Sequence, residues 1–233
     1  MLRIQIFRAR SSRVERQPFK LGVGGPSPPG LTRLPGGVTV ARLPLEQKIL
    51  GSNPSPAAMI KLDARELRTT EPTEDQLKKI KRNPIYLVLD NVLDTYNVGA
   101  LFRLADAVSA QKIYLCGQTE TPPNPKIKKA SVSTWKWVPW EYSKSTLSVV
   151  KALKKKSVQI IAVEQQKGAI SYKDLQPKFP VAVVLGNETY GITKDVLKQA
   201  DIVVELPMWG VNKSLNVMVT AGIALYKVME SLP

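Results

Sequence analysis

The sequence contains no histidine and only one cysteine among its 233 residues. Without histidine, the chain has no histidine-ligated metal site, no Ser-His-Asp triad and no imidazole acid–base chemistry. A single cysteine, Cys116, excludes an internal disulfide and indicates a reducing compartment. No apolar run is long enough to span a bilayer, and the first residues lack the apolar core of a signal peptide. We therefore expect a cytoplasmic protein that uses neither a membrane nor a metal.

Basic residues clearly outnumber acidic ones. The chain has 34 Lys and Arg against 19 Asp and Glu, a formal net charge of +15 and a pI near 9.9. Such an excess favours a polyanionic partner, most simply nucleic acid, although a basic protein without that partner would share the same composition.

Residues 1–58 differ in composition from the rest. They hold seven of the 14 glycines and eight of the 18 prolines, together with nine Lys/Arg and two acidic residues. No helical or alternating apolar period persists there. A weak repeat links the stretch from Val14 to the stretch from Val40, yet units so rich in Pro and Gly cannot stack into a core.

Two interpretations of this segment stay open. The first is that residues 1–58 are upstream sequence annotated by mistake, because the phrase GSNPSPA resembles a translated tRNA gene, and that the native chain starts at Met59. The second is a disordered basic arm that binds RNA. Residues 59–83 then form a charged, partly helical lead-in to a domain at 84–233.

From residue 84 onward, apolar runs of strand length alternate with helical periodicity. This alternation predicts an α/β fold with a mostly parallel sheet and helices on both faces. The expected elements are strand 85–92, helix 97–110, strand 112–117, basic loop 122–133, aromatic strand 133–142, helix 144–156, strands 158–165 and 179–188, helix 192–200, strand 201–208 and a final apolar helix.

The final helix is apolar on nearly every side, which is typical of a buried helix. Ser214 stands where an N-cap belongs, just before the apolar run. Lys213, Ser214 and Asn216 fall at the first turn, where free backbone N–H groups and the positive end of the helix dipole point. This turn either caps itself or faces a ligand.

Glycine and polar residues follow three of the expected strands. The first group contains Asn97, Gly99 and Arg103, the second runs from Gly186 to Gly191, and the third spans residues 208–216. Glycine at a strand end permits positive φ or a close approach of the backbone to a flat cofactor. Because parallel strands end at one edge of a sheet, we expect the three loops to form a common site there.

The motifs NVGALFRLADA (97–107), VVLGNETYGI (183–192) and LPMWGVNKSLNVMVTAGIALY (206–226) closely resemble, in this order, the three signatures of the SpoU/TrmH family of RNA ribose 2′-O-methyltransferases. Members are S-adenosylmethionine enzymes of the SPOUT class. The resemblance, over about 84–230, implies an α/β domain with a deep C-terminal trefoil knot, an obligate homodimer and a cofactor held in the knot.

The resemblance also implies roles for individual residues. Arg103 matches the arginine to which the family's central catalytic role is assigned, and four other residues complete the active site, in part across the dimer: Asn97, Glu188, Ser214 and Asn216. The residues expected to hold the cofactor are Val163, Gly186, Asn187, Gly191, Leu206, Met208, Ser214 and Leu215.

The reaction implied by the resemblance needs the proton of a weakly nucleophilic ribose hydroxyl to be removed. Arginine is a poor base in water because its pKa exceeds ~12. Two roles for Arg103 therefore stay open. It accepts the proton when desolvated, or it clamps the neighbouring phosphate with two hydrogen bonds while Glu188 or water accepts the proton.

Tryptophans are interleaved with lysines between residues 128 and 140. Trp135, Trp137 and Trp140 either stack on unpaired RNA bases or pack in the core or a dimer interface. The stretch SVSTWKW departs from the small-residue stretch usual in the family, which bears on substrate placement. The residues expected to contact RNA are Arg103, Lys128, Lys129, Lys136 and Lys213.

The function expected from the resemblance is methyl transfer to RNA. Guanosine in the tRNA D-loop is the favoured target, and ribosomal RNA is the main rival. A non-catalytic RNA-binding relative with the same fold is the alternative from a different functional class. None of the three loops carries a GxGxxG or GxxxxGK pattern, so a dinucleotide or nucleoside triphosphate is not expected.

Overall fold

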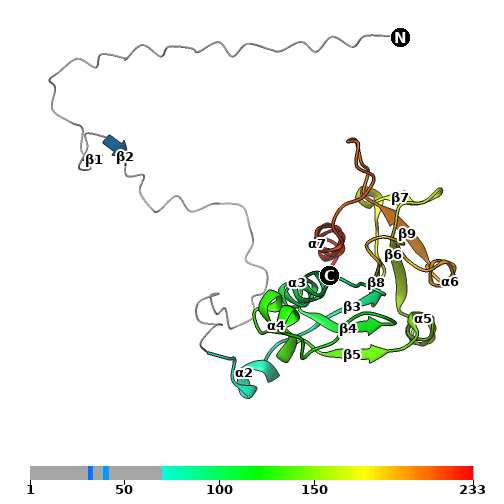
Figure 1. Cartoon of the computed structure of the whole chain (residues 1–233), viewed down its shortest axis with the longest axis horizontal. Coiled ribbons are helices and arrows are strands. Elements are labelled where there is room, and N and C mark those ends of the chain that lie inside the picture. Colours follow the sequence, from blue (N-terminus) through cyan, green and yellow to red (C-terminus); the bar gives the residue numbers. More distant parts are fainter. Residues whose placement is uncertain (1–30, 34–38, 42–69, 233) are drawn as a thin grey trace, which may run out of the picture. The chain divides into compact units, whose positions relative to one another are not determined.

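The computed structural model describes residues 31–33, 39–41 and 70–232. The chain divides into two units, residues 1–55 and 56–233, which we describe separately (Figure 1). In the first unit, β1 (Leu31–Arg33) pairs antiparallel with β2 (Thr39–Ala41). The predictions of a disordered or wrongly annotated segment at 1–58 and of a start at Met59 otherwise concern residues outside the described part of the chain.

The second unit is built on a seven-stranded sheet in which every neighbouring pair of strands is parallel. The order across the sheet is β5-β4-β3-β8-β6-β9-β7. The parallel α/β fold predicted from the sequence is thereby confirmed. The strands are β3 (Asn83–Asp90), β4 (Ala110–Cys116), β5 (Trp140–Ser143), β6 (Gln159–Val163), β7 (Ile170–Ser171), β8 (Val181–Gly186) and β9 (Ile202–Glu205).

Helices cover both faces of the sheet (Figure 1). Side chains alternate between the two faces, so that Leu87 and Leu89 join the core under α3, α4 and α7, while Val88 joins the core under α5 and α6. The helical elements are α2 (Glu74–Lys78), α3 (Thr95–Ala107), α4 (Pro125–Ser131), the 3-10 turn η1 (Thr134–Lys136), α5 (Thr146–Lys155), the 3-10 turn η2 (Tyr172–Asp174), α6 (Lys194–Leu197) and α7 (Val217–Met229).

Helix α3 begins two residues before the predicted Asn97, because the side chain of Asp94 accepts a hydrogen bond from the Tyr96 N–H at 2.8 Å and caps the helix. Gly99 lies inside this helix. A Cβ on Gly99 would lie 2.6 Å from the Cβ of Ala130 and 2.8 Å from the backbone oxygen of Ile127. Gly99 therefore allows α3 and α4 to pack closely, and its interpretation as part of a ligand loop is wrong.

The basic stretch 122–133, predicted as a loop, instead contains α4. Asn124 accepts hydrogen bonds from the backbone N–H groups of Lys126 and Ile127, at 2.9 and 3.4 Å, and a proline occupies the first turn. The buried Ile127 anchors the helix to the core. An Asn-Pro start and one anchoring side chain suffice for a helix too short to display a periodic pattern.

The aromatic strand predicted at 133–142 is also wrong. Residues Thr134–Lys136 form the turn η1, and the strand β5 begins only at Trp140. The indole N–H of Trp137 donates to Asp106 at 2.7 Å, and Trp140 packs edge-on against Phe102. Burial of these rings against α3 takes precedence over strand propensity.

The last helix starts at Val217, and its N-cap is Asn216, which accepts a hydrogen bond from the Met218 N–H at 2.8 Å. The prediction that Ser214 caps this helix is wrong. The helix is also only partly buried, since Val219, Ile223 and Tyr226 are exposed. The predicted helix at 192–200 is shorter than expected, because α6 spans Lys194–Leu197.

Candidate functional site

A pocket of about 340 Å³ lies at the carboxyl edge of the sheet, where β6, β8 and β9 end and α7 begins. This is the edge at which parallel α/β sheets bind ligands. Its size falls within the usual range for small-molecule sites, roughly 300–1,000 Å³. The lining residues are Val163, Glu164, Gln165, Leu185, Gly186, Asn187, Glu188, Thr189, Gly191, Glu205, Leu206, Met208, Lys213, Ser214, Leu215, Val217 and Thr220.

The loop after β8 closes on itself. Asn187 and Gly191 exchange two backbone hydrogen bonds, of 3.1 and 2.9 Å, and the Asn187 side chain accepts from the N–H groups of Thr189 and Tyr190. A Cβ on Gly186 would lie 2.3 Å from backbone atoms of Gly191 and the next residue. The glycine at 186 is therefore required by this closed loop itself, whereas the sequence interpretation attributed it to the close approach of a flat cofactor.

Glu164 supports the same loop from the end of β6. Its carboxylate accepts hydrogen bonds from the N–H of Ile192 at 2.8 Å and from the N–H of Gln165 at 3.1 Å. Gly191 has a φ of +68°, and a Cβ there would lie 2.2 Å from the Glu164 carboxylate. The carboxylate and the glycine together fix the path of the chain along one wall of the pocket.

A chain of side-chain hydrogen bonds joins the three loops. The Asn216 amide donates to Asn97 at 3.0 Å, and the Asn97 amide donates to Glu188 at 3.0 Å. The Glu188 carboxylate also accepts from the N–H groups of Leu93 and Asp94, each at 3.1 Å. Asn97 is buried at this junction. The loops after β3, β8 and β9 are thus parts of one connected structure, as the sequence predicted.

The pKa of Glu188 reflects these contacts. Partial desolvation of the carboxylate acts to raise its pKa, but the hydrogen bonds from Asn97 and from the backbone at Leu93 and Asp94 together outweigh that effect. The pKa of Glu188 is consequently lower than that of an ordinary glutamate. Its carboxylate is ionised at neutral pH and is a weaker base than usual.

All eight residues predicted to hold the cofactor line the pocket. Among the predicted catalytic residues, Glu188 and Ser214 also line it, while Asn97 and Asn216 reach it through the hydrogen-bonded chain described above. Arg103 is not among the lining residues, and its side chain is exposed on α3. The structure therefore brings together every predicted catalytic residue except Arg103.

Sequence reasoning missed several polar residues of the pocket. Glu164, Glu205 and Thr220 all line it, and none of them is among the residues predicted to hold the cofactor. A signal existed for the two glutamates, because each stands at the end of an apolar strand at the edge where the ligand loops were expected. Together with Glu188 they give the pocket three carboxylates, against one lysine, Lys213.

The residues predicted to contact RNA are dispersed. Lys213 lines the pocket, Lys128 and Lys129 are exposed on α4, and Lys136 forms an ion pair with Glu71. The three tryptophans are partly buried and pack against the core, as one of the two alternatives predicted. Over residues 70–232, no group of His, Cys, Asp and Glu could hold a metal ion, and no helix is long and apolar enough to cross a bilayer.

Residues 84–226 match the SpoU rRNA Methylase family. The chain is 28% identical to the tRNA (guanosine(18)-2′-O)-methyltransferase of Aquifex aeolicus, over 67% of this chain and 77% of the relative. It is also 28% identical to the 23S rRNA (guanosine-2′-O-)-methyltransferase RlmB of Ralstonia nicotianae, over 67% and 63% of the two chains.

Solved structures agree with these relatives. The A. aeolicus TrmH/SpoU tRNA modifying enzyme superposes with a TM-score of 0.61 at 27% identity, covering 68% of this chain and 83% of that one. The AdoMet-bound rRNA methyltransferase from Sinorhizobium meliloti gives 0.60 at 25% identity, covering 72% and 60%. With the family signature extending over the whole sheet and all three loops of the pocket, the chain belongs to the SpoU family of RNA methylases.

Proposed function

We propose that this protein transfers a methyl group from S-adenosylmethionine to a ribose 2′-hydroxyl of RNA. The observation that carries the proposal is the joining of three family-signature loops around one pocket at the carboxyl edge of the sheet. The relatives named above act on guanosine 2′-hydroxyls in tRNA or in 23S rRNA. We take tRNA as the favoured substrate and ribosomal RNA as the rival.

The pocket's chemistry suits this cofactor. A sulfonium donor carries positive charge, and the carboxylates of Glu164 and Glu205 supply negative charge in the lining. Lys213 offers the opposite charge for the carboxylate of the methionine portion. The apolar side chains of Leu206, Met208 and Leu215, with those of Val163 and Val217, supply the surface that a flat purine needs.

In the reaction, a bond forms between the ribose 2′-oxygen and the methyl carbon as the S–CH₃ bond breaks, and the hydroxyl proton leaves. Arg103 is exposed, and no hydrogen bond or ion pair joins its guanidinium to another residue of 70–232. An exposed guanidinium is suited to bidentate contact with a phosphate. We assign Arg103 to the phosphate next to the reacting ribose, which it orients for attack.

Glu188, Asn97 and Asn216 act by holding the loops in place. Glu188 already accepts three hydrogen bonds, and its lowered pKa makes it a weak base. Water is then the acceptor of the hydroxyl proton, and much of the acceleration comes from orientation, which can supply roughly 7–11 kcal/mol in favourable cases. Ser214 is exposed on the pocket wall and free to contact the ribose.

A second copy of the chain completes the site in this proposal. Val219, Ile223 and Tyr226 recur at helical spacing on α7 and form an exposed apolar stripe. Leu93 and Tyr96, in the loop and first turn leading into α3, are also exposed. Contiguous exposed apolar surface indicates an interface. A homodimer formed through α7 would let the Arg103 of one copy act at the pocket of the other.

The C-terminal segment is proposed to form the family's deep trefoil knot. The return of the chain supports it: β9 pairs with β6 beyond β8, and α7 then comes back across the sheet to pack on α3. The cofactor would lie where this returning segment passes the loop after β8. Knots of this kind are rare exceptions among protein folds.

Methyl incorporation from labelled S-adenosylmethionine into unmodified RNA tests the function. We expect the wild-type protein to label tRNA transcripts, with 2′-O-methyl mapping locating the nucleotide. Arg103→Lys should lower the rate by roughly 100-fold or more, because a lysine cannot form the bidentate contact. Cofactor binding without labelling of tRNA or ribosomal RNA would indicate a non-catalytic RNA-binding relative, and full activity in Arg103→Lys would refute the assigned role.

A further inference from the structure

The pocket rim is poorly suited to attract RNA by charge. Three carboxylates line it, those of Glu164, Glu188 and Glu205, while Lys213 is the one lysine among the lining residues. Phosphate groups approaching the rim therefore meet a net negative lining. Since neutralised phosphates supply most of the affinity of nucleic-acid binding, the attraction has to come from another surface.

Such a surface exists along α5 and α6, which cover the face of the sheet opposite to α3, α4 and α7. Lys151 and Lys155 are four residues apart on α5 and therefore share one stripe of the helix, and Lys144 lies two residues before the helix begins at Thr146. The side chains of the whole group are exposed. We define the α5–α6 lysine surface as Lys144, Lys151, Lys155, Lys156, Lys194 and Lys198.

The two helices present these lysines as one continuous surface. The Lys154 ammonium, from α5, donates to the Gln199 carbonyl at 2.8 Å and to Asp201 at 2.7 Å, which fixes α5 against the residues that follow α6. On α6, Asp195 pairs with Lys198 at 2.9 Å. The pKa of Asp195 is lowered mainly by Lys198 and also by the charge of Lys151, so the α5 stripe lies within electrostatic reach of α6.

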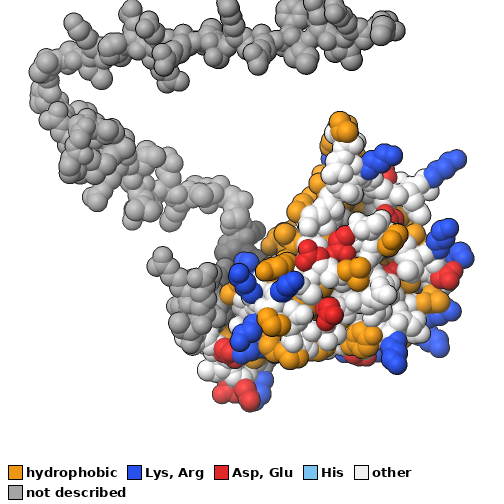
Figure 2. Space-filling view, in the orientation of Figure 1, with side chains coloured by type: hydrophobic (Ala, Val, Ile, Leu, Met, Phe, Trp, Pro, Cys, Tyr) orange, Lys and Arg blue, Asp and Glu red, His pale blue; other side chains and the backbone are white. Residues whose placement is uncertain are grey.

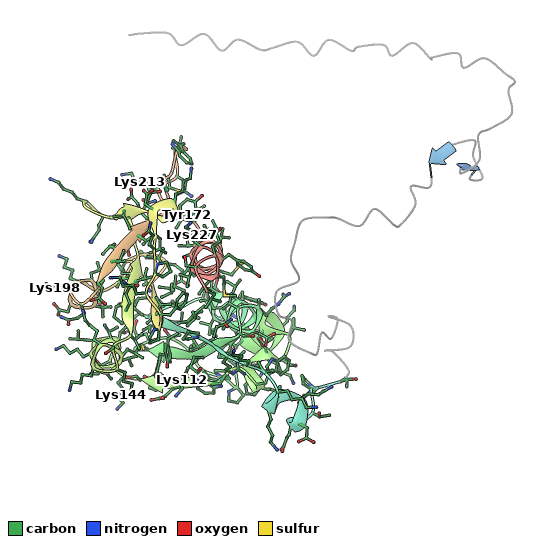
Figure 3. All side chains as sticks on the ribbon, turned by 180° about the vertical axis from the view of Figure 1, so that it is seen from behind. Lys112, Lys144, Tyr172, Lys198, Lys213 and Lys227 are labelled. Atoms are coloured by element: carbon green, nitrogen blue, oxygen red, sulfur yellow. The ribbon has the colours of Figure 1, made fainter. Side chains whose placement is uncertain are left out.

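The charge of this surface is largely uncompensated. The surface combines six lysines with one carboxylate, that of Asp195 on α6, while Lys154 and Asp201 neutralise each other. The surface therefore holds a net charge of +5 out of the +8 carried by residues 59–233. Figure 2 shows basic side chains along the right-hand edge of the second unit, over α5 and α6. Figure 3, seen from behind, shows Lys144 and Lys198 pointing outward near these helices, while Lys213 lies on the loop before α7.

We propose that the α5–α6 lysine surface binds the phosphate backbone of the substrate RNA at a distance from the nucleotide that is methylated. The inference rests on the proposed function and adds a second contact region to it. The pocket edge selects the reacting ribose, and this surface supplies the sequence-independent affinity that holds a large RNA in place. A substrate with structured RNA extending beyond the target nucleotide is required to reach it.

The test compares two triple variants with the same loss of charge. The stripe variant carries Lys144→Gln, Lys151→Gln and Lys155→Gln, which remove two lysines of α5 and the lysine that precedes the helix. Lys167→Gln, Lys173→Gln and Lys178→Gln remove three exposed lysines from the connection between β6 and β8, and serve as the matched control. Binding of labelled bulk tRNA is measured between 50 and 300 mM salt, alongside S-adenosylmethionine affinity and thermal stability.

The loss of three phosphate contacts should weaken tRNA binding by roughly 10- to 50-fold at physiological salt. The slope of the logarithm of the tRNA association constant against the logarithm of the salt concentration should become less negative by about 2. The KM for RNA should rise while kcat and cofactor affinity stay unchanged, because the surface lies away from the reacting atoms. The control variant should change tRNA affinity by less than about threefold.

Equal weakening in both variants, or no weakening in the stripe variant, would overturn the inference while leaving methyl transfer by the wild type intact. Binding of the stripe to anionic phospholipid vesicles, with no difference in tRNA affinity, would overturn it in favour of a membrane surface. Failure of the proposed function itself gives a different result, namely tRNA binding by the wild type without labelling of any RNA.

Discussion

At the scale of single residues, Glu188 acts through the hydrogen bonds that it accepts. Because its folded pKa is lowered, its contribution to stability is present above the pKa of an unfolded glutamate, near ~4.3, and is lost as pH falls through the lower folded value. In the wild type, the two carboxylate oxygens accept hydrogen bonds from the N–H groups of Leu93 and Asp94 and from the Asn97 amide. In Glu188→Gln only one side-chain oxygen can accept, so at least one of these three hydrogen bonds is lost.

We expect Glu188→Gln to lower the free energy of unfolding by about 1 kcal/mol at pH 7, because hydrogen bonds to an exposed carboxylate make a net contribution to stability of about that size. Urea unfolding at pH 7 and at pH 3 measures the difference. The gap between the two proteins should shrink as pH falls through the lowered pKa of the wild-type carboxylate. A gap that stays constant over this range would mean that the charge of Glu188 contributes nothing.

At the scale of elements, the close packing of α3 and α4 depends on Gly99. A methyl group at this position would lie 2.8 Å from the Ile127 carbonyl oxygen, and the backbone cannot move aside as a flexible side chain could. We expect Gly99→Ala to destabilise the protein by roughly 1–3 kcal/mol, despite alanine's better helix propensity. Thermal and chemical unfolding measure the loss.

Gly210→Ala is the control, since nothing lies within 4 Å of a Cβ at that position and its φ is not positive. It should leave stability unchanged or raise it slightly. If Gly99→Ala were as stable as Gly210→Ala, the contact between the two helices would have to be looser than the distances indicate.

The exposed stripe on α7 leads to a second prediction at this scale. Ile223→Asp places a charge in the proposed dimer interface and should convert the protein to a monomer with little methyl transfer, because Arg103 then lacks a partner pocket. Ile170→Asp is the matched control, since Ile170 on β7 is 38% exposed and Ile223 is 37% exposed. Light scattering coupled to gel filtration measures the mass. A dimeric Ile223→Asp protein would exclude α7 as the interface.

The sequence predicts some elements well and others badly, for physical reasons. The run at 85–89 reads as a strand because side chains on both of its faces pack into the core, which favours apolar residues at every position. The stretch at 133–142 is predicted wrongly because its first two tryptophans, which are partly buried, are positioned against the core by a turn and not by a strand. Ser214 and Asn216 are both good N-caps, and only the folded path of the preceding loop decides between them.

At the scale of the whole molecule, the meeting of three loops could be predicted because parallel strands end at one edge. The chain of bonds from Asn216 through Asn97 to Glu188 could not, since it joins residues up to 119 positions apart along the sequence. The strand order, which places β8 between β3 and β6, likewise depends on contacts that no local pattern encodes. The α5–α6 lysine surface becomes visible only when two helices are seen together.

Because these loops form one connected unit, cofactor binding should slow amide hydrogen exchange in all of them at once. We expect S-adenosylmethionine to protect residues 91–97, 186–192 and 206–217 together, and to leave α5 unchanged. Asn97→Ala removes the junction, so protection at 91–97 should disappear while the other two segments, which line the pocket directly, keep part of theirs. Mass spectrometry of the exchanged peptides measures each segment separately. Protection confined to a single loop in the wild type would show that the three loops bind no common ligand, and the proposed methyl-transfer site would have to be abandoned.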